Sequence, residues 1–164
     1  MRTTGRLIAL ALALVVAGCG SDDKPSKPAE TATSGAPYGS YTRAITKADI
    51  DRTDKVRDES GPKQAAPKPT AARLVIAKGS GQDVLRITEE RDGFSVAMDL
   101  GVKDDELKLY SYVNPYQGSW CGPQIAESAA YAYEMQGDAL VLKPAHPDAC
   151  ADRDSTLTGT WKKG

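Results

Sequence analysis

Apolar and polar residues alternate through most of the second half of the chain, which is the period-two pattern of half-buried strands. The clearest run covers residues 94–100, where every second side chain is apolar: Phe94, Val96, Met98 and Leu100. The same alternation predicts further strands over residues 39–46, 73–78, 84–89, 107–113, 129–135, 139–143 and 156–162. Eight strands in succession are enough to close a small barrel.

The residues between these runs support short connections. Arg91-Asp92-Gly93 and Gln136-Gly137-Asp138 have the composition of hairpin turns, and Lys103-Asp104-Asp105 predicts a third. After the first strand, Thr46 and Asp49 have the spacing of a capping box, which predicts a short helical turn through Ile50 and Arg52. Residues 51–72 are polar and contain three prolines, so we expect a long excursion over the surface.

These patterns predict an all-β fold: an eight-stranded antiparallel up-and-down barrel with one short helix after the first strand. No second long helix is expected. An open β-sandwich is the alternative, because period-two alternation alone does not show whether the sheet closes.

The first eighteen residues have the organisation of an export signal. Arg2 and Arg6 precede an apolar run over residues 7–17, which is about half the length that a membrane-spanning helix needs. Val16-Ala17-Gly18-Cys19 then matches the bacterial lipobox, in which the cysteine thiol receives a diacylglyceryl group and becomes the new N-terminus. Several acyl chains on one residue anchor a protein stably, so we predict a lipid anchor at Cys19 on the extracytoplasmic face of the cell membrane. An ordinary cleaved signal is the alternative.

The segment that follows the anchor is polar. Residues 20–37 contain almost no apolar side chain larger than alanine, so they bury too little surface to offset the entropy of ordering. The sequence therefore predicts three parts: a lipoprotein signal peptide over 1–18, the lipidated cysteine with a disordered tether over 19–37, and a folded domain over 38–164.

Two cysteines remain for the folded domain. In an oxidising compartment, Cys121 and Cys150 predict a disulfide. A pair of metal ligands is the alternative, but the chain has no CxxC spacing and a single histidine, His146. We expect no metal and no cofactor.

Charge and candidate catalytic residues give few further indications. Without Arg2 and Arg6, 19 of the 21 basic residues remain against 22 acidic ones, a mildly acidic balance that argues against a nucleic-acid or anionic-lipid surface. His146 and Asp148 stand two residues apart in a predicted loop, which does not define a catalytic triad. The Gly-rich stretch 78–81 precedes a strand, not the helix that a phosphate-binding loop needs. We therefore do not expect an enzyme.

Several short motifs together resemble a family of small bacterial, actinobacterial-style lipoproteins with a lipocalin-like (calycin) domain. They are Gly39-Ser40-Tyr41 with residues 45–50, then Trp120-Cys121, and the stretches 131–140, 148–153 and 157–161. The resemblance spans residues 38–161 and implies an up-and-down barrel whose two ends meet. Tyr41 stands where lipocalins usually have a tryptophan. By this resemblance, Tyr41, Arg153 and Trp161 close the barrel, with the Arg153 guanidinium lying over Tyr41 or Trp161. The alternative for Arg153 is an ordinary surface arginine in a loop.

The apolar face of the barrel is the main candidate for function. Nine residues are predicted to point inward, as ligand-lining or core side chains: Phe94, Val96, Met98, Leu107, Leu109, Tyr131, Tyr133, Leu140 and Leu142. If they line a cup, the protein is a tethered binding module for a small hydrophobic or amphipathic ligand. If they fill the barrel, it is a structural or protein-interaction lipoprotein of the cell envelope, with the loop 114–123, which holds Tyr116 and Trp120, as the predicted contact patch. The alternative for Trp120 is that it covers the disulfide at Cys121.

Overall fold

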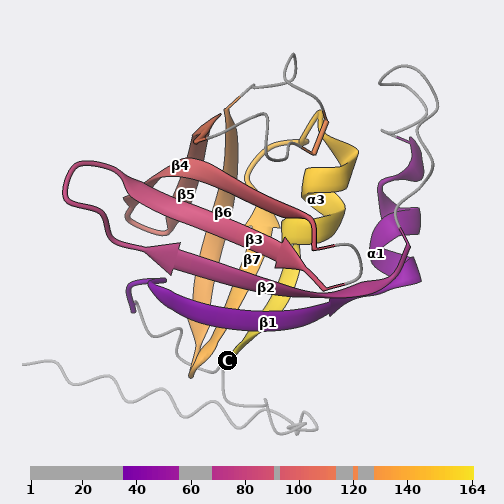
Figure 1. Ribbon diagram of the computed structural model, residues 1–164, viewed down its shortest axis with the longest axis horizontal. Coiled ribbons are helices and arrows are strands. Elements are labelled where there is room, and N and C mark those ends of the chain that lie inside the picture. The colour runs from indigo at the N-terminus through magenta and orange to yellow at the C-terminus, as the bar shows by residue number, and fades with distance from the viewer. Residues whose placement is uncertain (1–34, 56–67, 91–92, 114–119, 122–127) are drawn as a thin grey trace, which may run out of the picture.

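The computed structural model describes residues 35–55, 68–90, 93–113, 120–121 and 128–164. Within them, eight antiparallel strands follow one another around a closed barrel, and the last strand pairs with the first (Figure 1). The strands are β1 (Gly39–Ile45), β2 (Thr70–Ala77), β3 (Asp83–Glu89), β4 (Ser95–Lys103), β5 (Glu106–Tyr112), β6 (Ala129–Gln136), β7 (Ala139–Pro144) and β8 (Gly159–Lys163). The predicted up-and-down barrel is confirmed, and the sandwich alternative is wrong. The leader, Cys19 and residues 20–34 lie outside the described residues, as do 56–67 and most of the 114–127 connection.

The pairing register brings the apolar sides of neighbouring strands together. In β3 and β4 the register places Leu85 opposite Met98 and Ile87 opposite Val96, so the apolar sets of neighbouring strands face the same side. All four of these side chains are at most 1% exposed. Because every strand carries such a set, closing the sheet on itself buries all of them at once and leaves no free edge.

The predicted first helix is present. α1 (Lys47–Arg52) starts after Thr46, whose hydroxyl accepts a hydrogen bond from the Asp49 N–H at 3.3 Å. The Asp49 carboxylate accepts in return from the Thr46 N–H at 2.8 Å, which completes the capping box. Ile50 is the buried residue of this turn.

A second helix, α3 (Ala151–Leu157), was not predicted from the sequence. The strand expected over 156–162 starts only at Gly159, and Leu157 ends the helix instead of sharing a strand with Trp161. Arg153, Ser155 and Thr156 are buried in α3. The helix therefore lacks the apolar stripe from which an amphipathic helix is recognised, and its burial against the barrel stabilises it.

The two ends of the barrel differ. The turns β2–β3, β4–β5 and β6–β7 gather at the end where β1 starts, which we call the hairpin end. At the β4–β5 and β6–β7 turns the predicted residues adopt positive φ, +52° at Asp104 and +63° at Gly137. Gly93 of the third predicted turn has φ +64°, while its neighbours 91–92 lie outside the described residues. α1 and α3 contact each other at the opposite end, which we call the helix end (Figure 1).

Candidate functional site

The barrel interior is packed with side chains. Seven of the nine predicted inward residues are at most 1% exposed: Val96, Met98, Leu107, Leu109, Tyr131, Leu140 and Leu142. A side chain without exposed surface borders neither solvent nor an internal void large enough for water. For these seven positions the structure supports core filling and not a preformed cup. Phe94 and Tyr133 are only partly buried and pack against the edge of this core.

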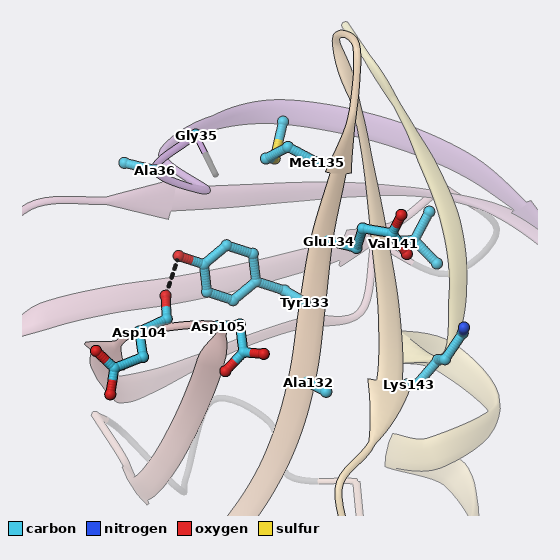
Figure 2. A pocket seen from close by; sticks show the side chains of 10 residues that line it. All are labelled: Gly35, Ala36, Asp104, Asp105, Ala132, Tyr133, Glu134, Met135, Val141 and Lys143. Atoms are coloured by element: carbon cyan, nitrogen blue, oxygen red, sulfur yellow. Dashed lines mark hydrogen bonds between the residues drawn. The ribbon is translucent and has the colours of Figure 1, made fainter. Parts of the chain in front are cut away.

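Tyr133 lies at the hairpin end, beside the largest hollow that we describe. This hairpin-end hollow has a volume of about 900 Å³ (Figure 2). It is lined by Gly35, Ala36, Asp104, Asp105, Ala132, Tyr133, Glu134, Met135, Val141 and Lys143. Figure 2 shows that the lining side chains fall on two sides of β6, so the hollow follows this strand. Two of them, Tyr133 and Met135, pack against the edge of the core.

One side of β6 presents an aromatic ring next to two carboxylates. Tyr133 holds the β4–β5 turn by two contacts: its N–H donates to the Asp105 carbonyl at 2.7 Å, and its hydroxyl donates to the Asp104 carbonyl at 2.8 Å. Burial, and then the negative charges of Asp105 and Asp104, raise the pKa of the Tyr133 phenol, so it is neutral and donating at physiological pH. Met135 lies on the same side, toward Gly35 and Ala36 (Figure 2).

On the other side of β6 lie one acidic, one basic and one apolar side chain of the hollow's lining (Figure 2). Glu134 pairs with Val141 across the β6–β7 ladder, and Lys143 pairs with Ala132 one step further along. Val141 is only 9% exposed although it alternates with the inward-facing Leu140 and Leu142. The hollow therefore combines an apolar strip with charged groups at its margins.

The helix end is held together by an arginine that the sequence analysis did not single out. Arg43 alternates inward with Tyr41 and Ile45, and its side chain is only 6% exposed. Its guanidinium pairs with Asp49 at 2.7 Å and donates to the carbonyl oxygens of Thr156 and Thr158 at the C-terminal end of α3. One side chain thus joins β1, α1 and α3.

The predicted barrel-closing contact is present with a different cation. The guanidinium of Arg43, not that of Arg153, lies over the Trp161 ring, 5.6 Å from its centroid. Arg153 is buried as predicted for a closing residue, but its guanidinium lies against Asp148. Tyr41 is also buried, and its hydroxyl donates to the Pro37 carbonyl at 3.1 Å. The sequence signal that could have identified Arg43 is its spacing, because it stands two residues from Tyr41 and from Ile45 and so shares their inward-facing side of the strand.

Asp148 is the centre of a second buried polar group. Its carboxylate accepts from Arg153 Nε at 2.8 Å and Nη2 at 2.7 Å, from the Tyr131 hydroxyl at 2.6 Å and from the Cys150 N–H at 2.8 Å. Burial, and then the Asp148 charge and hydrogen bond, raise the pKa of Tyr131 well above its usual value. Burial works to lower the pKa of Arg153, but the hydrogen bond and charge of Asp148 outweigh it and raise this pKa. The Tyr131 phenol therefore has a protein partner and needs none from a ligand.

The predicted disulfide lies next to this group. Cys121 and Cys150 are bonded, with their Cα atoms 5.7 Å apart, and Cys150 precedes α3 directly. Trp120 is only 6% exposed and belongs to the core, so of its two expected roles the exposed contact patch is wrong. Its neighbours 114–119 in that predicted patch lie outside the described residues.

Metal ligands do not converge in the part of the chain that the structure describes. No three His, Cys, Asp or Glu side chains there are placed to hold a metal ion. His146 is exposed and borders a separate hollow of about 310 Å³ at the helix end, which Glu106 and Lys108 also line.

The fold and the site define a class: a closed eight-stranded antiparallel barrel with a filled interior, the described helices α1 and α3 at one end and a hollow at the other. No protein-family model, curated protein or solved structure matches the chain. Among the described residues, no helix has the length and apolar character to cross a membrane.

Proposed function

We propose that this protein is a lipid-anchored extracytoplasmic lipoprotein that binds a small amphipathic molecule in the hairpin-end hollow. The observation that carries the proposal is the hollow itself. Its volume of about 900 Å³ falls in the range of small-molecule sites, and its lining combines apolar side chains with a few polar groups. Such a mixed lining suits a molecule that has both an apolar and a polar part.

The packed interior argues for the hollow over the cup that the sequence suggested. A ligand inside the barrel must displace side chains such as Met98 and Leu109, both without exposed surface, from a core at crystal-like density. A ligand in the hollow covers Met135 and Tyr133, which are only partly buried.

The position of the tether supports the same end of the barrel. Gly35 and Ala36 line the hollow and directly follow the segment that leads back to Cys19. The tether predicted from the sequence has fifteen residues, 20–34, between Cys19 and Gly35, and a coil of that length spans roughly 20 Å. With Cys19 lipidated, the hollow stays within a few nanometres of the bilayer, where amphipathic molecules concentrate.

Ligand binding is tested by thermal unfolding of the purified protein with a panel of amphipathic compounds. A binding compound raises the melting temperature, by mass action on the folded state. Met135→Ala should reduce this rise, while Val75→Ala, on the outer face of β2 away from the hollow, should not. If no compound raises the melting temperature, or if Met135→Ala leaves the rise unchanged, the proposed site is wrong.

Anchoring is tested separately by cell fractionation. The protein should be found with membranes, and Cys19→Ala should release it or leave it as an unprocessed precursor. A Cys19→Ala protein that is processed and held at the membrane like the wild type would contradict the lipid anchor.

The filled interior also favours a second function, a structural or protein-interaction lipoprotein that binds no small molecule. Tyr110 and Val113, 42% and 53% exposed, are the large exposed apolar side chains of the described chain and mark its contact surface. Crosslinking in intact cells through a photoreactive residue at position 113 should then trap a specific protein. Failure to trap one would count against this alternative.

A further inference from the structure

The hairpin-end hollow is negatively charged. Its ten lining residues include the carboxylates of Asp104, Asp105 and Glu134 against the single ammonium of Lys143. Figure 2 shows Lys143 on the opposite side of β6 from Asp104, Asp105 and Tyr133. No described cation forms an ion pair with either Asp104 or Asp105. Among the described residues, the charge on the Tyr133 side is therefore uncompensated.

The Tyr133 side also has the geometry that organic cations need. An aromatic ring attracts a cation over its face, and nearby carboxylates add charge attraction. In Figure 2 the Asp105 side chain lies beside the Tyr133 ring, while the Asp104 carboxylate points away from the ring on the same side of β6. Both carboxylates belong to a tight turn that the Tyr133 N–H and hydroxyl hold by hydrogen bonds of 2.7 and 2.8 Å. Because the ring and the turn are fixed to each other, a ligand meets a preorganised group and loses little free energy to ordering it.

An apolar surface continues from this charged corner. Met135 lies beyond Tyr133 on the same side of the strand, with Gly35 and Ala36 across from it (Figure 2). The thioether is a flexible, polarizable contact for an aliphatic chain. Charge and apolar surface are thus arranged in sequence along one strand.

We propose that the hollow selects amphiphiles with a positively charged organic ammonium group, which lies between the Tyr133 ring and the carboxylates of Asp104 and Asp105. The aliphatic part of the ligand lies along Met135. An anionic amphiphile of the same length meets two like charges at that corner and is rejected. This inference rests on the proposed function, because it assigns the ligand class of the same hollow.

The test compares three amphiphiles with one decyl chain below their micellar concentrations: decyltrimethylammonium, decyl maltoside and decyl sulfate. Isothermal titration calorimetry on the purified protein should show the ammonium binding about tenfold more tightly than the maltoside, a preference that falls as salt is added. The sulfate should bind more weakly than the maltoside.

Asp→Asn variants, which remove the charge and keep the size of the side chain, show which carboxylates cause the preference for the ammonium. Asp104→Asn with Asp105→Asn should abolish the preference for the ammonium and leave maltoside affinity within about twofold. Asp51→Asn removes the same type of charge from α1, at the opposite end of the barrel, and should change nothing. Melting temperatures confirm that each variant is folded.

The possible failures are distinguishable. If none of the three amphiphiles binds, the proposed function fails together with this inference. If all three bind equally well, the hollow binds amphiphiles but the selection for cations is overturned. If the preference survives in the double Asp104/Asp105 variant, the assignment of the cation to this corner is wrong.

Discussion

Arg43 makes the clearest prediction about what closes the helix end of the barrel. Arg43→Met keeps most of the aliphatic length and removes the guanidinium. The change deletes the 2.7 Å ion pair with Asp49, the hydrogen bonds to the Thr156 and Thr158 carbonyls, and the stacking over Trp161. All of these contacts belong to a side chain that is 6% exposed.

The expected cost follows from that burial. Removing one partner of a buried ion pair typically costs about 3–5 kcal/mol, because the other charge is left without compensation. Asp49 is 21% exposed and keeps its hydrogen bonds from Thr46, so its own penalty is moderate. The stacking contact adds about 1 kcal/mol, and the carbonyl groups lose a charged donor. We expect a total near the lower bound, about 3 kcal/mol.

Urea unfolding followed by tryptophan fluorescence measures this cost. In a thermal melt of the same protein, a loss of about 3 kcal/mol should lower the melting temperature by roughly 10 °C for a domain of this size. Arg73→Met is the matched control, because Arg73 is exposed on neighbouring β2 and, among the described residues, donates only to Ser40 at 3.0 Å. Its expected change is within about 0.5 kcal/mol.

A double-mutant cycle with Asp49→Asn isolates the ion pair, and its coupling energy should be about 1 kcal/mol or more. An Arg43→Met protein destabilised by less than about 1 kcal/mol, or no more than Arg73→Met, would refute the role of Arg43 in closing the barrel.

Three further predictions concern the same framework. Gly159→Ala should destabilise the fold by about 2 kcal/mol or more, since Gly159 has φ +134° and an added Cβ would lie 2.6 Å from the Arg43 guanidinium. Gly81→Ala is the control: a Cβ added there meets no atom within 4 Å, so the free energy of unfolding in the same urea assay should hardly change. Burial works to raise the pKa of Asp49, but hydrogen bonds from Thr46 and the Arg43 guanidinium outweigh burial and lower this pKa. The Asp49 carboxylate therefore stabilises the fold above its unfolded pKa near 4, and this stabilisation is lost as pH falls through the pKa of the folded state. The stability advantage of wild type over Asp49→Asn should therefore be full at pH 6 and shrink toward pH 3; an advantage that grows on acidification would contradict the sign. Replacing both Cys121 and Cys150 by Ala should cost about 3 kcal/mol in urea unfolding, because the disulfide closes a loop with a sequence separation of 29 residues, and an unchanged unfolding midpoint would count against it.

Strand positions and their inward faces could be predicted from the sequence because alternation is a local signal. Each run needs only its own residues to show which side is apolar, and the apolar runs around Val96, Leu107 and Tyr131 were placed correctly for that reason. The capping box at Thr46 and the turn at Gly137 are equally local, since their chemistry lies within four residues. The disulfide followed from counting cysteines in an expected compartment.

Only the tertiary structure decided what closes and fills the barrel. Whether an inward residue lines a cup or a core depends on how far the opposite strands stand apart, which no single strand records. α3 is too short and polar to show a helical period, and its burial against the barrel stabilises it. Arg43 and Trp161 lie near opposite ends of the chain, so no local pattern could show that the Arg43 guanidinium covers the Trp161 ring. The hairpin-end hollow likewise joins residues from the β4–β5 turn, β6 and the segment before β1, which become neighbours only when the sheet closes.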